Sequence, residues 1–201
     1  MKSGFTLIEL LVSISIFIII TSVAIWNNNA FNSSVLLTDL GYEIALSVRQ
    51  AQVYGTTVKA PSLCVNGSCS SYFTSGYGVD FNITQPSQYI LFEDGKVGSI
   101  PDHIYEQGEL LENYTIGRGY SIKKLCVSAG NGTYKSTNKI DISFIRPEPE
   151  AWVYDGIDSP SQIEVDIYVQ DPQKTTDRDI VIEPTGQISV VNDDTVLNEC
   201  H

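Results

Sequence analysis

The sequence has few of the side chains on which enzymes and metal centres are built. Its 201 residues include one Met, four Cys and two His, one of which is the last residue. Basic residues are also scarce, since 12 Lys and Arg stand against 24 Asp and Glu, giving a formal net charge of −12. Phosphate backbones and anionic lipid headgroups repel a surface of this charge. These shortages disfavour catalysis and the binding of nucleic acid through a basic face.

The charge is distributed unevenly along the chain. Residues 1–60 hold three basic and three acidic side chains, whereas residues 61–201 hold nine basic and 21 acidic ones. The acidity therefore belongs to the second part, where we expect it to favour solubility. This part is long enough to bury a core of its own. We predict one acidic globular head and an N-terminal appendage.

Residues 10–26 form an apolar run without charge, Gly or Pro. Together with residues 5–9 the run comprises 22 residues, roughly 33 Å of α-helix against a hydrocarbon core of about 30 Å. Lys2 precedes the run, which places that end in the cytoplasm and the rest of the chain outside. A cleaved secretory signal peptide is the alternative, but its apolar stretch is shorter, and Ser22-Val23-Ala24 is a poor cleavage site. We predict a single-pass membrane helix.

Glu9 lies inside this apolar stretch, with Lys2 as the only basic side chain before Arg49. An ionised carboxylate in the bilayer costs about 3 kcal/mol even on lenient scales, so it is a candidate functional residue. It needs a cationic partner. A cut after Gly4 would create a free amino group on Phe5, one helical turn away.

Residues 2–12, KSGFTLIELLV, resemble the processing motif of type IV prepilins and of the pseudopilins of type II secretion systems. The resemblance implies that a membrane prepilin peptidase cuts between Gly4 and Phe5, and that the new amino group of Phe5 is methylated. It also implies that the apolar helix becomes a filament core, with other pilin subunits and an inner-membrane assembly platform as partners. Glu9 would then pair with the Phe5 ammonium of a neighbouring subunit and set the axial register.

Residues 35–54 continue the helical pattern beyond the membrane. Their apolar positions follow steps of three and four, the spacing of one helical stripe: Leu37, Leu40, Ile44, Val48 and Ala51. The polar positions of the same helix are Asp39, Glu43, Arg49, Gln50 and Gln52. Gly55 follows as a C-cap. We predict one continuous helix from Phe5 to about Tyr54, like the spine of pilins.

The predicted organisation has three parts. Residues 1–4 are a leader peptide, residues 5–55 a helix, and residues 56–201 the head. Within the helix, residues 5–26 form the transmembrane and filament-core part, and residues 27–55 pack on the head. The segment 45–58, with Arg49 and Gly55, also resembles the pseudopilin H and FimT branch of the family.

The head has the alternation of β-strands. Alternating or β-rich runs occupy 77–82, 88–93, 114–126, 139–145, 163–170, 179–182 and 187–191, and turn residues separate them. The last two runs flank Glu183-Pro184-Thr185-Gly186, which predicts a closing hairpin. The expected fold class is α+β, with a long N-terminal helix packed on an antiparallel β-sheet head, as in the pilin fold.

The four cysteines suggest two disulfides. Cys64 and Cys69 bracket Asn66-Gly67, a strong hairpin signal that places the two cysteines opposite each other. Cys126 and Cys200 would then form the second bond. Oxidising conditions outside the membrane favour disulfides over two alternatives, free thiols and a zinc site that includes His201.

Other polar residues of the head have simpler interpretations. Asp94-Gly95-Lys96 and Asp155-Gly156-Ile157-Asp158 have turn composition without the spacing of a calcium loop, so we expect solvated turns. We interpret the glutamates as a soluble acidic face rather than as acid/base pairs; they are Glu106, Glu109, Glu112, Glu148 and Glu150. His103 has no Ser or Cys motif beside it, and we expect an exposed loop histidine.

These observations favour a structural subunit of a type IV pilus-like filament, major or minor, without catalytic activity, cofactor or bound metal. It would cross the inner membrane once before assembly and then join a periplasmic or extracellular filament. A type II secretion pseudopilin shares every residue of this argument. A membrane-tethered adhesin, with exposed Trp152 and Tyr154 for binding, is the alternative from another class. DNA uptake would need a basic stripe that the acidic head lacks.

Overall fold

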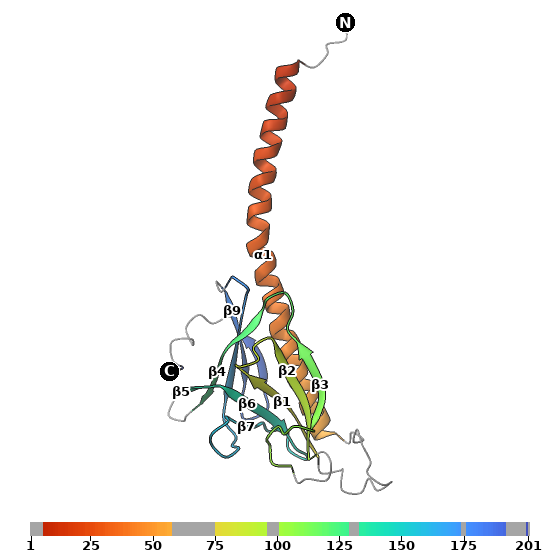
Figure 1. The fold of residues 1–201 in the computed structure, drawn as a ribbon, viewed down its shortest axis with the longest axis vertical. Coiled ribbons are helices and arrows are strands. Elements are labelled where there is room, and N and C mark those ends of the chain that lie inside the picture. Colours follow the sequence, from red (N-terminus) through yellow and green to blue (C-terminus); the bar gives the residue numbers. More distant parts are fainter. Residues whose placement is uncertain are drawn as a thin grey trace. The chain divides into compact units, whose positions relative to one another are not determined.

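The computed structural model describes residues 6–57, 75–95, 101–128, 133–173, 176–191 and 200, with the backbone alone for residues 26–32. The described residues contain one α-helix and ten β-strands (Figure 1). They are α1 (Leu7–Thr56), β1 (Gly76–Asn82), β2 (Gln88–Asp94), β3 (Leu110–Thr115), β4 (Ser121–Ser128), β5 (Tyr134–Thr137), β6 (Lys139–Phe144), β7 (Trp152–Tyr154), β8 (Val165–Gln170), β9 (Asp177–Ile182) and β10 (Ile188–Val191). The chain divides into two compact units, Met1–Leu36 and Leu37–His201.

Helix α1 is continuous over 50 residues, from Leu7 to Thr56. The N–H of Leu10 donates to Thr6 O at 3.3 Å at its start, and the N–H of Thr57 donates to Val53 O at 3.0 Å at its end. Neither the Asn-rich patch at 27–29 nor Gly41 interrupts it. The predicted helix from Phe5 to about Tyr54 is confirmed, with each end shifted by two residues.

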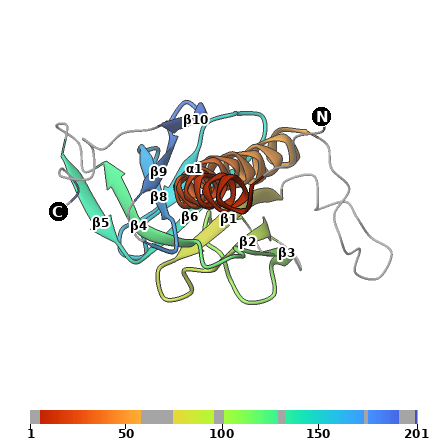
Figure 2. The ribbon, with the colours of Figure 1, turned by 90° about the horizontal axis from the view of Figure 1, so that it is seen from above.

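The strands form two five-stranded antiparallel sheets. The first has the order β3-β2-β1-β6-β7 and the second the order β10-β9-β8-β4-β5. The chain builds β1 to β3 in the first sheet, β4 and β5 in the second, returns for β6 and β7, and ends in the second. Figure 2 shows β1, β2 and β3 on one side of the head and β4, β5, β8 and β9 on the other. The predicted α+β class is confirmed, with two sheets where the sequence suggested one.

The apolar stripe of the head half of α1 is buried, as predicted. Leu37, Ile44, Val48 and Ala51 have no exposed surface, and Leu40 is 8% exposed. Polar contacts reach the helix from both sheets. The hydroxyl of Ser47 in the helix lies 3.0 Å from that of Tyr89 in the first sheet. Arg178 of the second sheet donates from Nε to Oγ1 of Thr38 in the helix at 3.1 Å. Both sheets therefore contact this half of the helix.

Two residues of this helix have roles other than those the sequence suggested. Gly55 is not a C-cap but lies within the last helical turn, where a Cβ would be 2.2 Å from the carbonyl oxygen of Phe144 in β6. Gln52, expected on the polar side, is buried and donates from Nε2 to Pro149 O at 2.9 Å and to Gly186 O at 3.0 Å. Contacts between distant segments fix both roles, so local sequence could not show them.

The strand predictions are confirmed in type, with local errors. The predicted run 114–126 contains a turn, because β3 ends at Thr115 and β4 begins at Ser121. Arg118 and Gly119 have left-handed φ values of 59° and 79° there, and a strand does not contain such residues. Sequence reasoning missed β5 and β7, which have four and three residues.

The C-terminal part of the head is closed as predicted. β9 and β10 form an antiparallel hairpin, and Gly186 takes the left-handed φ of 80° in its turn. A disulfide joins Cys126 of β4 to Cys200 with 6.0 Å between Cα atoms, and both cysteines are buried. The predicted Cys64–Cys69 hairpin lies outside the described residues and stays a prediction.

Replacing Gly55 with Ala should destabilise the head. The added methyl group would overlap the backbone of Phe144, so the helix must shift away from β6, at a cost of about 2 kcal/mol or more. Chemical denaturation of the full chain in detergent measures the change. The matched control is Gly117→Ala, because a Cβ at Gly117 meets nothing within 4 Å. Equal stabilities of the two variants would contradict the close approach.

Peptide mapping without reduction should find Cys64 linked to Cys69 and Cys126 linked to Cys200. A Cys126→Ser and Cys200→Ser double variant should lose up to about 4.5 kcal/mol of unfolding free energy, because the Cys126–Cys200 bond closes the longer loop. The six-residue ring between Cys64 and Cys69 should contribute only about 2 kcal/mol. A peptide linking Cys64 to Cys126 would refute the hairpin argument.

Candidate functional site

The first part of α1 has the length and composition of a membrane span. Residues Leu7–Ile25 have a mean hydropathy of 2.5, and none of their side chains is buried within the protein. Exposed apolar side chains surround this stretch rather than forming a stripe; they include Leu7, Ile8, Phe17, Ile20 and Val23. Such a surface needs lipid or other apolar helices around it.

The uncharged polar residues of this span are satisfied within the helix. The hydroxyls of Ser13, Ser15, Thr21 and Ser22 each donate to the carbonyl oxygen four residues earlier, at 2.7 to 2.8 Å. They therefore need no partner outside the helix. Glu9 remains as the one ionisable side chain of the span.

Glu9 is held by the N-terminus of its own helix. Its Oε2 accepts hydrogen bonds from the backbone N–H of Thr6 at 2.9 Å and from the Thr6 hydroxyl at 2.7 Å. The N–H of Glu9 lies 3.3 Å from Thr6 Oγ1 in return. This reciprocal arrangement is a capping box, with Thr6 as N-cap and Glu9 three residues later.

Thr6 is a residue of this candidate site that sequence reasoning missed. The search for a partner of Glu9 considered only cations, but the Thr-x-x-Glu spacing is itself the signal for this cap. Glu9 thus has hydrogen-bond donors within its own chain. The predicted cleavage site, Gly4 and Phe5, lies outside the described residues, immediately before the cap.

The head half of α1 has a second apolar surface, opposite its buried stripe. Tyr42, Leu46 and Val53 are 55%, 68% and 45% exposed and follow one another by four and seven residues along the helix. Tyr42 and Leu46 border an open groove of about 390 Å³ whose other wall includes Ile188 of β10. This surface offers an apolar contact to a partner.

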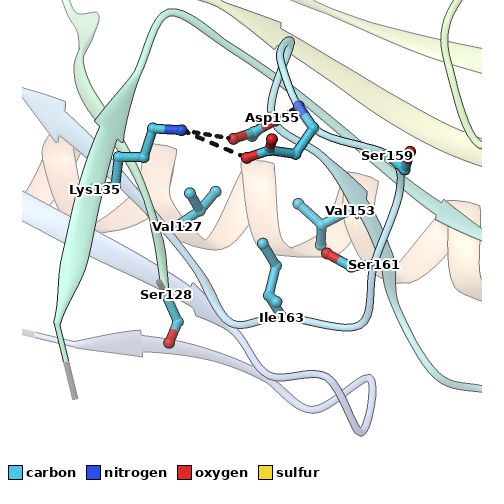
Figure 3. A pocket seen from close by; sticks show the side chains of 9 residues that line it. Val127, Ser128, Lys135, Val153, Asp155, Ser159, Ser161 and Ile163 are labelled. Carbon is cyan, nitrogen blue, oxygen red and sulfur yellow. Dashed lines mark hydrogen bonds and ion pairs between the residues drawn. The ribbon is translucent and has the colours of Figure 1, made fainter. Parts of the chain in front are cut away.

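A cavity of about 420 Å³ lies between the outer strands of the two sheets (Figure 3). Val127, Val153 and Ile163 form its apolar part. At its rim, Lys135 Nζ lies 3.4 Å from Asp155 Oδ2 and 3.6 Å from Asp158 Oδ2. The cavity has the size of a small-ligand site, but its charged groups already pair with one another.

Three interpretations of acidic residues are corrected. Asp94 is the last residue of β2 and is buried, and the Asp155 side chain is also buried, although Gly156, Ile157 and Asp158 after it are exposed as a solvated turn predicts. Asp155 Oδ1 accepts the N–H groups of Ile157 and Asp158, at 3.0 and 2.7 Å. Glu109 is also buried, and it accepts the N–H groups of Gly95 and Glu106 rather than joining an acidic face. Among the described residues, no three His, Cys, Asp or Glu side chains gather as a metal site would require.

The interpretation of His103 as an exposed histidine is wrong. Its ring stacks on Trp152 with 4.6 Å between centroids, and Nδ1 lies 2.8 Å from Ser143 Oγ. Burial lowers the pKa of this imidazole. Trp152 and Tyr154, expected to be exposed for ligand binding, are each half-buried in β7. His103 and Trp152 pack against each other and present no open aromatic platform.

Comparison with known proteins adds one finding. Residues 1–25 match the model of the prokaryotic N-terminal methylation motif, which is typical of type IV pilins and pseudopilins. Neither a curated protein nor a solved structure gives a match. The motif covers the capping box and the apolar span but none of the head, so the branch of the family is not resolved.

Replacing Thr6 with Val should loosen the first turn of α1. The change removes the hydroxyl that contacts both Glu9 Oε2 and the N–H of Glu9, and losing an N-cap costs about 1 kcal/mol. Amide hydrogen exchange of the full chain in detergent should therefore quicken at Leu7–Leu10. Ser13→Ala is the control, because the Ser13 hydroxyl donates to the carbonyl oxygen of Glu9 and takes no part in the cap. Unchanged exchange in the Thr6 variant would contradict the cap.

Proposed function

We propose that this chain is a structural subunit of a type IV pilus-like filament, made as a membrane-anchored precursor and without catalytic activity of its own. The match of residues 1–25 to the methylation motif carries the proposal. The exposed apolar half of α1 supports it, because such a surface suits both the bilayer and the core of a helical bundle. The long helix packed on antiparallel sheets agrees with the pilin architecture.

The precursor is processed at its N-terminus. A prepilin peptidase cuts between Gly4 and Phe5, and the new amino group of Phe5 is methylated. This places an ammonium group next to Thr6, at the start of α1. An inner-membrane assembly platform then moves the helix from the bilayer into the filament.

Glu9 sets the axial register of the filament. Apolar contacts between packed helices are nearly interchangeable, so one helix slides past another at little cost. A carboxylate and an ammonium group in an apolar core do define a register, since each costs several kcal/mol when unpaired and the pair recovers much of that cost. The Phe5 ammonium of a neighbouring subunit is the partner of Glu9.

The capping box prepares Glu9 for this role. In the single chain, the Thr6 N–H and hydroxyl occupy only Oε2. A carboxylate accepts several hydrogen bonds, so Oε1 remains able to bind an ammonium while the cap persists. The cap also fixes the carboxylate at the first turn of the helix, the level at which a neighbour's N-terminus must lie.

A second apolar contact supports assembly in the head half of α1. Once the helix of one subunit leaves the bilayer, its apolar surface must be covered by protein. The exposed stripe of Tyr42, Leu46 and Val53 offers such cover to the apolar helix of a neighbouring subunit. The same contact would serve a pseudopilus of a type II secretion system, which is the alternative machine. Loss of surface filaments in a deletion strain favours the pilus, and loss of protein secretion favours the pseudopilus.

Glu9→Gln and Glu9→Leu should leave processing and membrane insertion intact while filament incorporation falls at least about tenfold, because a lost ion pair in an apolar core exceeds 1.4 kcal/mol. Gly4→Leu should instead leave an uncut precursor in the membrane. Immunoblots of precursor, mature and filament fractions separate these outcomes, in a strain without the wild-type subunit.

The matched control is Ser13→Leu, which makes a polar-to-apolar change one turn further along the same helix without altering charge. We expect this variant to assemble normally. Normal incorporation of Glu9→Leu would refute the register mechanism. Normal maturation of Gly4→Leu would refute the processing step.

A further inference from the structure

The face of the first sheet that carries Asp80 and Asp141 is directed away from α1 and is covered by residues 101–109, here called the strap. The strap is tied to the sheet through its backbone and through the side chains of His103 and Tyr105, which contact Trp152 and Phe92. Asp94 of β2 accepts the N–H groups of Asp102 and His103, at 3.0 and 2.9 Å. Asp141 of β6 accepts the N–H of Tyr105 at 2.9 Å. Buried carboxylates therefore hold the strap in place.

Two carboxyl groups face each other beneath the strap. Asp80 of β1 and Asp141 of β6 are directly opposite in the antiparallel register. Asp80 is 6% exposed and Asp141 is fully buried. Within the described part of the chain, Asp80 Oδ1 and Asp141 Oδ1 are buried oxygen atoms without a hydrogen-bond donor.

A single cation serves both groups. Lys139 Nζ lies 2.8 Å from Asp141 Oδ2 and 3.7 Å from Asp80 Oδ1. The same ammonium lies over the rings of Tyr105 and Tyr154, 5.8 and 5.6 Å from their centroids. The site therefore contains two buried carboxyl groups and one half-buried ammonium group.

Two ionised carboxylates at this position would leave a net negative charge under the strap and two oxygen atoms without donors. One proton removes both problems, because a protonated carboxyl group donates to its ionised neighbour. We propose that Asp80 and Asp141 share one proton, and that this proton and Lys139 form a pH-sensitive clasp that holds the strap on the first sheet.

The groups facing the pair come from every neighbouring element. They are Asp80 on β1, Lys139 and Asp141 on β6, Tyr154 on β7 and Tyr105 on the strap, while Ile90 of β2, opposite Asp80, is uncharged. Burial and the neighbouring carboxyl group of Asp80 raise the pKa of Asp141, against the opposing effect of Lys139.

The direction of the pH dependence follows from this raised pKa. The native pair binds its proton more tightly than the unfolded carboxyl groups, whose pKa is about 3.9. Its stabilisation is therefore complete below that value and is lost as the pH rises through the raised native pKa. Above it, Asp141 Oδ1 lacks the donor that the shared proton supplied, and the Tyr105 tether weakens.

Hydrogen exchange of the Tyr105 amide tests the clasp in the full chain in detergent. After correction for the intrinsic rate, protection should fall about tenfold between about pH 6 and pH 9, the effect of one unit of pKa. Asp80→Asn supplies a permanent N–H donor to Asp141 Oδ1, so the pH dependence at the Tyr105 amide should become smaller than in the wild type; the part that remains comes from Asp94, which holds Asp102 and His103 and whose pKa burial raises to about 7. Protection in the wild type that does not change with pH would overturn the proposal, as would an Asp80→Asn variant that keeps the wild-type dependence.

Asp166→Asn is the matched control. Asp166 is 2% exposed in β8 of the second sheet, and burial raises its pKa to about 7, yet it does not contact the strap. Its replacement should leave the pH dependence at Tyr105 unchanged. A carboxyl-carbon NMR titration of the wild type tests the shared proton without any variant: two ionised groups at about pH 6 would refute it.

Discussion

The burial of one stripe of α1 is the interaction on which the head depends. Both sheets carry buried apolar side chains, such as Val79 in the first and Ile167 in the second, and the stripe of residues 37–51 is buried in the same head. The contacts at Tyr89 in the first sheet and Arg178 in the second show the helix held from both sides. The same helix is apolar on all sides over Leu7–Ile25. One continuous element thus meets two kinds of apolar surroundings, and its pattern changes from all-round to one-sided between them.

The difference between local apolar patterns and contacts between distant segments explains which features the sequence alone predicts. The apolar span, the stripe and the helix between them depend on local periodicity, and the structure agrees with them. Gly55 and Gln52 depend on residues about 90 and 130 positions away, Phe144 and Gly186, so no local pattern reveals their roles. The pairing of β1 with β6, which separates the strands into two sheets, is likewise a long-range choice.

The acidic composition has a different meaning in the folded head. A net charge of −12 suggested a solvated surface, yet nine carboxyl groups of the described residues are buried. Several accept backbone N–H groups of irregular segments, as Asp94, Glu109, Asp155 and Asp171 do. Such segments lack the N–H partners that a sheet would supply, and an ionised oxygen is a strong acceptor. Composition reports the number of carboxylates but not which of them hold loops.

Glu9 uses the same chemistry at the start of α1. In the head, a buried carboxylate binds backbone N–H groups that have no other partner; at the start of α1, Glu9 binds the N–H of Thr6 for the same reason. The difference lies in the environment. Thr6 and Glu9 are exposed in the single chain, whereas Asp94 and Asp141 are enclosed by the strap. A carboxylate enclosed in this way can only stabilise its own chain, but one that is capped and still accessible can also accept a charge from another chain. Accessibility of the acceptor, rather than its chemistry, distinguishes Glu9, the proposed assembly residue, from the structural ones.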